Sequence, residues 1–135
     1  MTVKRVWEIP SVRMNPPAER NMQVVLSKQS DDVRDFSFLV ANLYPHGGST
    51  SIHTHDCSDE LVYVVSGRGV GQVGDETVDI VPDTVLYAPA GVPHGVTNLG
   101  DEGMKLACFF IPGLPDERIA ALTDGAVLRI HKGKE

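Results

Sequence analysis

This chain is organised around Gly47-Gly48-Ser49-Thr50-Ser51-Ile52-His53-Thr54-His55-Asp56-Cys57-Ser58-Asp59-Glu60, in which two histidines stand one residue apart and a carboxylate follows five positions later. Residues two apart on a strand point to the same face, so His53 and His55 can reach one ion. Glu60 has the opposite parity, but the turn-forming residues 56–59 allow a loop that resets the alternation. Glu60 would then begin the next strand and face both histidines.

Short runs of β-branched and aromatic residues lie on both sides of this stretch, and Gly and Pro separate them. We expect strands at 22–26, 36–44, 53–55, 61–65, 70–73, 77–81, 85–88, 96–97 and 105–111. A turn every eight to twelve residues or so is typical of an all-β sandwich or barrel. A helix is expected at 116–122, where Pro115 precedes two acidic residues.

The length of 135 residues fits a single domain. We expect an N-terminal arm or strand at 1–30, a barrel at 31–113, and a short helix with a frayed tail at 114–135. Prolines at 10, 16 and 17 break the arm. Trp7 would give the arm a side chain to bury, in its own subunit or in a partner.

Charge and hydrophobicity narrow the possible partners. The formal net charge of -6 argues against nucleic acid or anionic membranes as partners. No apolar run approaches the length of a membrane span, and no signal peptide is evident, so we expect a cytoplasmic protein. Cys57 and Cys108 do not make a disulfide framework, which fits a reducing compartment.

Two motifs carry a family resemblance. The first runs Gly47, five residues, His53-x-His55, four residues, Glu60, six residues, Gly67. The second runs from position 83 to position 98 and reads Pro-x-Gly-x-x-His-x-x-x-Asn from position 89. In this order, and over about half of the chain, they resemble the two signatures of the cupin superfamily. The pair is far more specific than either motif alone.

The resemblance implies a double-stranded β-helix, or jelly-roll barrel, of six to eight strands. It also implies that His53, His55, Glu60 and His94 surround one divalent metal ion at the barrel mouth. Asp83 stands where the family usually has Gly, and Asp tolerates the left-handed backbone region better than most residues. We therefore expect a turn at Asp83 with little consequence for metal binding.

Three imidazoles and one carboxylate suit Fe, Mn, Ni or Zn, and ligand affinity alone does not choose among these metals. In a tetrahedral zinc site the four ligands would close the shell and hold a structural ion. An octahedral site would keep positions open for water, substrate or O2. Metal identity therefore decides between a structural and a catalytic ion.

The leading hypothesis is a mononuclear metal enzyme acting on a small oxygen-rich organic molecule. A dioxygenase is the first choice, and an isomerase or decarboxylase comes next; no general acid or base is identifiable. The alternative is a non-catalytic small-molecule-binding or sensing cupin with a structural metal. Small cupins usually pair, so we expect a homodimer in which the arm crosses to the partner.

Other signals have simpler explanations. Residues 69–74 match Gly-x-Gly-x-x-Gly, but a strand rather than a helix is expected after them, so they indicate a hairpin and not a dinucleotide site. A Cys57–His55 nucleophile pair is conceivable, although an exposed thiol explains Cys57 equally well. Tyr63 should point away from the ion because its parity differs from that of Glu60.

Few other residues are expected near the ion. Leu106, Cys108 and Phe110 share a parity and could line one wall of the barrel. Arg68 and Lys105 are the basic residues nearest to the motifs in sequence, but Arg68 should face solvent from a hairpin turn. Asn98 is expected to tie a turn. A largely apolar barrel with few charges beyond the ligands would favour a small, partly apolar substrate.

Overall fold

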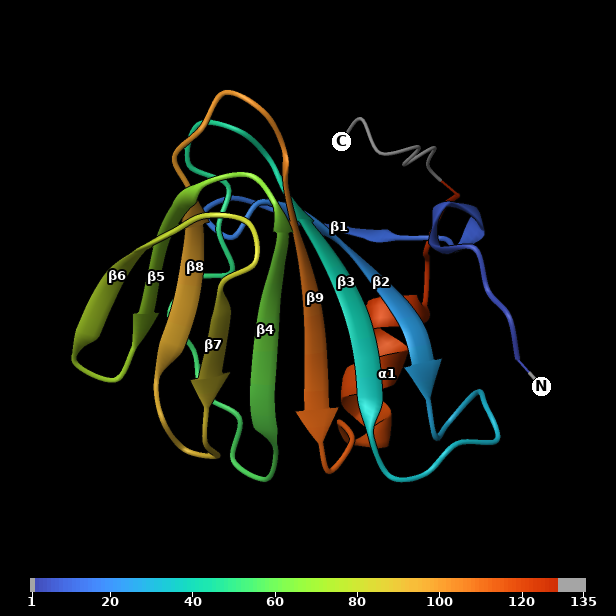
Figure 1. Cartoon of the computed structure of the whole chain (residues 1–135). Helices are drawn as coiled ribbons and strands as arrows, with labels where there is room; N and C mark the ends of the chain where they lie inside the picture. The colour runs from blue at the N-terminus through green and yellow to red at the C-terminus, as the bar shows by residue number, and fades with distance from the viewer. Residues whose placement is uncertain (1, 129–135) are drawn as a thin grey trace.

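The protein folds as two antiparallel sheets that face each other, with one short helix near the C-terminus (Figure 1). The computed structural model describes residues 2–128, so the tail expected at 132–135 lies outside the described residues. The large sheet has the strand order β1-β2-β3-β9-β4-β7. Its strands are β1 (Val12–Met14), β2 (Arg20–Ser27), β3 (Ser37–Leu43), β4 (Asp59–Ser66), β7 (Val85–Ala88) and β9 (Met104–Ile111).

The small sheet has the order β6-β5-β8 and consists of β5 (Gly69–Val73), β6 (Glu76–Ile80) and β8 (His94–Asn98). The helix α1 (Asp116–Thr123) lies against β2, and Ile119 and Leu122 on it are buried. In Figure 1 the small sheet stands over the β4–β7 side of the barrel, and α1 lies on the β2–β3 side. The apolar core lies between these layers and includes Met22, Leu39, Leu43, Val64, Ile80, Met104 and Leu106.

This architecture confirms the expected all-β jelly-roll barrel with a short C-terminal helix. The hairpin expected around residues 69–74 is also confirmed, because β5 pairs with β6 and Gly74 has a φ of 58° in the turn between them. Asp83 has a φ of 67°, as the turn at that position requires. Tyr63 is 36% exposed and bonds Asp83, so its side chain points toward solvent and away from the buried Glu60, as its parity predicts.

One expected element is different. Residues 53–55 do not form a regular strand, because only His53 among them makes a β-bridge, to His94 in β8. The cause lies two residues earlier, where Ser51 has a φ of 58° and interrupts the β ladder. The bridge between His53 and His94, with backbone hydrogen bonds of 2.9 Å in both directions, still ties this segment to β8.

Asn98 ties a turn, as the sequence predicts. Its side-chain amide donates to the carbonyls of Leu43, Tyr44 and Glu102 at 2.8–3.2 Å, and its Oδ1 accepts the Gly100 N–H at 2.9 Å. This buried side chain holds the end of β8 against the end of β3 and the turn before β9.

The N-terminal residues add to the large sheet. The strand expected at 22–26 extends over Arg20–Ser27 as β2 and pairs with β3. Before it come β1 and a 3-10 turn, η1 (Val6–Glu8), whose carbonyl at Val6 accepts a 2.7 Å bond from Gln23. Trp7 on η1 is 46% exposed. The expected boundaries at residues 30 and 113 stay predictions, as does the cytoplasmic location. Of the helices in residues 2–128, none has the length and hydrophobicity to cross a bilayer.

Candidate metal centre

Four side chains from three parts of the chain meet inside the barrel. His53 and His55 come from the extended segment after Ser51, Glu60 from the start of β4, and His94 from the start of β8. One donor atom from each lies within 4.8 Å of all the others. Glu60 Oε1 lies 2.6 Å from Nε2 of His94, 3.2 Å from that of His55 and 3.9 Å from that of His53.

Backbone hydrogen bonds fix which ring nitrogen of His53 and of His94 faces Glu60. Nδ1 of His53 lies 2.8 Å from the Ser51 carbonyl, and Nδ1 of His94 lies 2.9 Å from the Val92 carbonyl. A carbonyl only accepts, so each Nδ1 carries the proton, and a neutral ring then has its lone pair on Nε2. These Nε2 atoms are the ones directed at Glu60.

The ring of His55 is held by an aromatic contact, and its Nε2 has no hydrogen-bond partner. Its ring stands edge-on to Phe110, with centroids 4.9 Å apart at 85°. Its Nε2 is buried and makes no hydrogen bond, although it lies 3.2 Å from Glu60 Oε1. A buried ring nitrogen without a hydrogen bond is unfavourable unless it has another partner. A metal ion is such a partner.

The charge states fit the same interpretation. Burial would raise the pKa of Glu60, but interactions with His53, His55 and His94 outweigh it and hold the pKa well below its usual range. Burial would lower the pKa of His94, but the contact with Glu60 and the Val92 carbonyl raise it above its ordinary value. An ionised carboxylate thus sits among three nitrogens that compete for it, and the cluster can hold one divalent cation.

Two spaces that share lining residues border three of these four side chains. An inner cavity of about 30 Å³ is bordered by all of them except His94. A wider cleft of about 850 Å³ runs between the segment 53–58 and the segment 112–121. Both spaces are lined by His53, His55, Leu114 and Arg118. A small molecule in the cleft therefore meets the two histidines first, because Glu60 lines the inner cavity and not the cleft.

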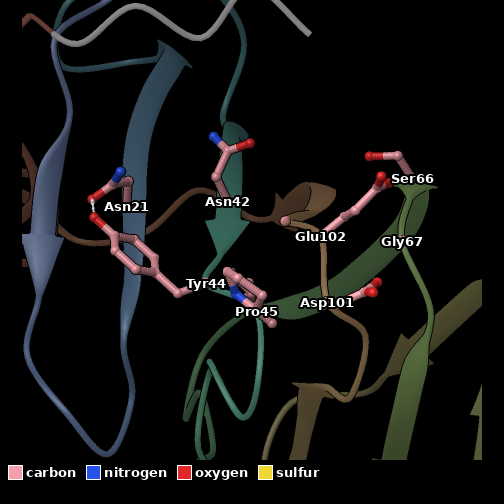
Figure 2. A pocket seen from close by; sticks show the side chains of 10 residues that line it. Asn21, Asn42, Tyr44, Pro45, Ser66, Gly67, Asp101 and Glu102 are labelled. Carbon is pink, nitrogen blue, oxygen red and sulfur yellow. Dashed lines mark hydrogen bonds between the residues drawn. The ribbon is translucent and has the colours of Figure 1, made fainter. Parts of the chain in front are cut away.

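A separate hollow of about 530 Å³ lies elsewhere, lined by Asn21, Asn42, Tyr44, Asp101 and Glu102 among others (Figure 2). The Tyr44 hydroxyl donates to Asn21 at 3.2 Å, and the buried Asn42 amide makes no hydrogen bond. None of the four ligands lines this hollow, and within residues 2–128 they form the one group of donors suited to a metal ion.

Several residues near the centre were expected and others were missed. Leu106, Cys108 and Phe110 do line the cavities beside the ligands. The expectation of few charges beyond the ligands is wrong, because Arg20 and Arg118 both line the inner cavity. The alternation of β2 carried the missing signal, since Arg20 has the same parity as Met22, which is 6% exposed.

The basic residues nearest in sequence are not those nearest in space. Arg68 lines a solvent-facing hollow with Val81 and Pro82, and Lys105 lines none of the three cavities that the candidate ligands border. Cys57 is exposed in the cleft, whereas Cys108 is buried in the inner cavity, where burial raises its pKa well above the ordinary value for a thiol.

Comparison with known proteins agrees with this fold. A family model described as "Cupin domain" matches residues 40–110. An uncharacterized protein of Methanocaldococcus jannaschii is 30% identical over 74 residues, which are 55% of this chain and 59% of that relative. This chain thus spans less than two thirds of that relative's length.

Two further comparisons come from Thermotoga maritima. Its oxalate-binding protein is 27% identical over 93 residues, covering 69% of this chain and 76% of that one. A crystal structure described as a predicted oxalate decarboxylase superposes with a TM-score of 0.73 at 25% identity. That alignment covers 81% of this chain and 97% of the other.

Proposed function

The chain belongs to the cupin family, and from that premise we propose that it is a mononuclear divalent-metal enzyme acting on a small oxygen-rich molecule. The observation that carries the proposal is the cluster of His53, His55, Glu60 and His94, which lies beside a cleft of about 850 Å³. A purely structural ion would not need a ligand set that borders such an opening.

Two of the four residues would hold the ion, and the other two would face the molecule that enters from the cleft. Glu60 and His94 are almost fully buried and would anchor the ion, while His53 and His55 border the cleft and would face an incoming molecule. Phe110 and Leu114 line the inner cavity beside them and limit the entry of water. A divalent ion held there would supply Lewis acidity to substrate oxygens.

We place dioxygenation first among the reactions, with isomerisation or decarboxylation next. Three imidazoles and a carboxylate suit Fe(II) as well as Mn, Ni and Zn, so the reaction depends on the metal that the protein acquires. A non-catalytic binding protein is the second candidate, and the similarity to the oxalate-binding protein of Thermotoga maritima favours it.

The same proposal includes a homodimer. The outer face of β4 and β7 exposes Tyr63, Val65, Val85 and Tyr87, at 36–53% of their surface. Tyr63 is opposite Val85 in the sheet, so these side chains form one apolar patch. A second copy of the chain would cover it.

The test begins with metal analysis of protein purified without a chelating resin. We expect one divalent ion per chain, its loss in His55→Ala, and its retention in His46→Asn, which changes a histidine outside the cluster. Asn suits position 46 because the φ there is 60°. Loaded protein is then assayed for O2 consumption, CO2 release and isomerisation of small organic acids and polyols.

The outcomes separate the candidates. Turnover that requires the metal and is lost in His55→Ala supports the enzyme. Tight zinc that no small molecule can reach supports a structural ion. Full activity of metal-free protein would contradict the proposal.

A further inference from the structure

Arg20 is a buried cation without an acidic partner. It begins β2, is 6% exposed, and makes hydrogen bonds only to neutral groups. Its Nε donates to the Met22 sulfur at 3.2 Å, and Nη1 donates to the carbonyls of Ala18 at 3.0 Å and Ser49 at 3.5 Å. No carboxylate in the described part of the chain lies within 4 Å of it. Nη2 makes no hydrogen bond there either.

A guanidinium in this position is unfavourable by itself. Burial lowers the pKa of Arg20, and the positive charge of Arg118 lowers it further, yet an arginine stays cationic at neutral pH. A buried charge that lacks a counter-ion destabilises the fold unless something else neutralises it. Glu60 is near enough to act on Arg20 electrostatically, but its oxygen is already shared among three histidines.

Arg118 brings a second positive charge to the same place. It is half-buried on α1 and lines both the inner cavity and the wide cleft. Arg20 lines only the inner cavity. An anion that enters from the cleft therefore passes Arg118 before it reaches Arg20, and His53 and His55 lie along the same path.

We propose that the molecule bound at the metal centre is a small organic acid, and that its carboxylate is held by Arg20 and Arg118. This inference rests on the proposed function and names its substrate class. Two guanidinium groups, a divalent ion and the Glu60 carboxylate give the site a formal charge of about +3, although the chain as a whole carries -6. An anionic ligand reduces this excess, whereas a neutral sugar would leave Arg20 without a counter-ion.

The size of the inner cavity favours a carboxylate over a larger anion. Its volume of about 30 Å³ is two to three times the roughly 10–15 Å³ that a cavity needs in order to hold one water molecule. One carboxylate oxygen fits such a space, while a tetrahedral phosphate with its full set of oxygens does not. The rest of the ligand would lie in the cleft, where Lys28 is already paired with Asp35 at 3.0 Å.

The experiment compares two chelating probes on dialysed, Mn²⁺-loaded protein by isothermal titration calorimetry. Malonate and acetohydroxamate each bind a divalent ion through two oxygens, but malonate alone offers a carboxylate. We expect Arg20→Met to weaken malonate binding at least tenfold, which corresponds to about 1.4 kcal/mol. Binding of acetohydroxamate should change by less than about twofold. Arg118→Met should weaken malonate roughly threefold or more, because its charge is partly solvated.

Arg20→Lys serves as the rescue variant. Arg118→Met serves as the second variant, because Arg118 is half-buried on α1 and its replacement threatens the fold less than that of the buried Arg20. Partial recovery of malonate binding in Arg20→Lys supports the inference. Equal malonate affinity in the wild type and in both Met variants overturns the inference. It is also overturned if Arg20→Met loses affinity for malonate, acetohydroxamate and the metal together while Arg118→Met binds malonate as tightly as the wild type. If neither probe binds metal-loaded wild type, the proposed open metal site fails instead.

Discussion

Replacing Gly95 by Ala should distort the metal centre through a backbone contact. Gly95 follows His94 in β8, and a Cβ there would lie 2.6 Å from the Ser51 carbonyl oxygen and 2.9 Å from Cδ1 of Ile52. That oxygen accepts the bond from His53 Nδ1 that orients the ring. It must move by about 0.4 Å or more to reach 3.0 Å, below which real Cβ contacts are essentially never seen.

The displacement has two measurable effects. Overpacking of this kind destabilises a fold by about 1–3 kcal/mol, so chemical denaturation of the metal-free variant should show that loss. Disturbing the group that orients a histidine ligand weakens metal binding about 10–100-fold, which competition with a chromogenic chelator can measure. The effect on the metal should exceed the effect expected from lost stability alone, because the moved carbonyl is bonded to a ligand.

Gly100→Ala is the matched control. A Cβ at Gly100 would meet its nearest atom, Asn98 Oδ1, at 3.4 Å, and none of the metal ligands. Its stability should stay within about 0.5 kcal/mol of wild type, with unchanged metal affinity. If Gly95→Ala binds metal as tightly as wild type and unfolds at the same denaturant concentration, the inferred contact between β8 and the segment around Ser51 is wrong.

Three further predictions concern protons, thiols and assembly. Because the pKa of His94 is raised in the folded state, protonation of His94 stabilises the metal-free fold fully below the ordinary pKa of 6.5, and this stabilisation is lost as the pH rises through the folded pKa. The melting temperature of metal-free protein should therefore fall over that pH range relative to that of metal-loaded protein. Parallel melting curves for the two forms would refute the assignment. One thiol per native chain should react with Ellman's reagent, because Cys57 is exposed and Cys108 is buried with a raised pKa; rapid reaction of both would contradict the burial of Cys108. Val85→Glu places a charge on the apolar patch and should convert the proposed dimer to a monomer in gel filtration. Removal of the residues before Pro16 tests instead whether the N-terminal arm forms the dimer contact. A dimer that survives both changes would exclude both surfaces.

Much of the ligand set was accessible from local pattern. His53 and His55 share a parity, and the turn at 56–59 returns Glu60 to their side. His94 joined the set only through the resemblance of residues 83–98 to the second cupin signature. Each of these features depends on a few consecutive residues. The left-handed turn at Asp83 was predictable in the same way, because backbone conformation there depends on the residue itself.

The interruption at Ser51 was harder to predict. The segment that carries His53 has the composition of a strand, but it pairs with β8 only at isolated bridges. A serine with a φ of 58° does not stand out in the sequence, because its conformation is imposed by the contacts that surround it.

The sequence by itself indicated an all-β barrel, since strand parity and turns are local properties, and its resemblance to the two cupin signatures implied four residues able to share one ion. Only the tertiary structure decided what surrounds that ion. Arg20 and Arg118 are almost a hundred positions apart, and each is far in sequence from the histidines. They reach one cavity because β2 joins the large sheet beside β3 and α1 packs against β2. The charge of a binding site is a sum over elements that folding brings together, and no local pattern contains that sum.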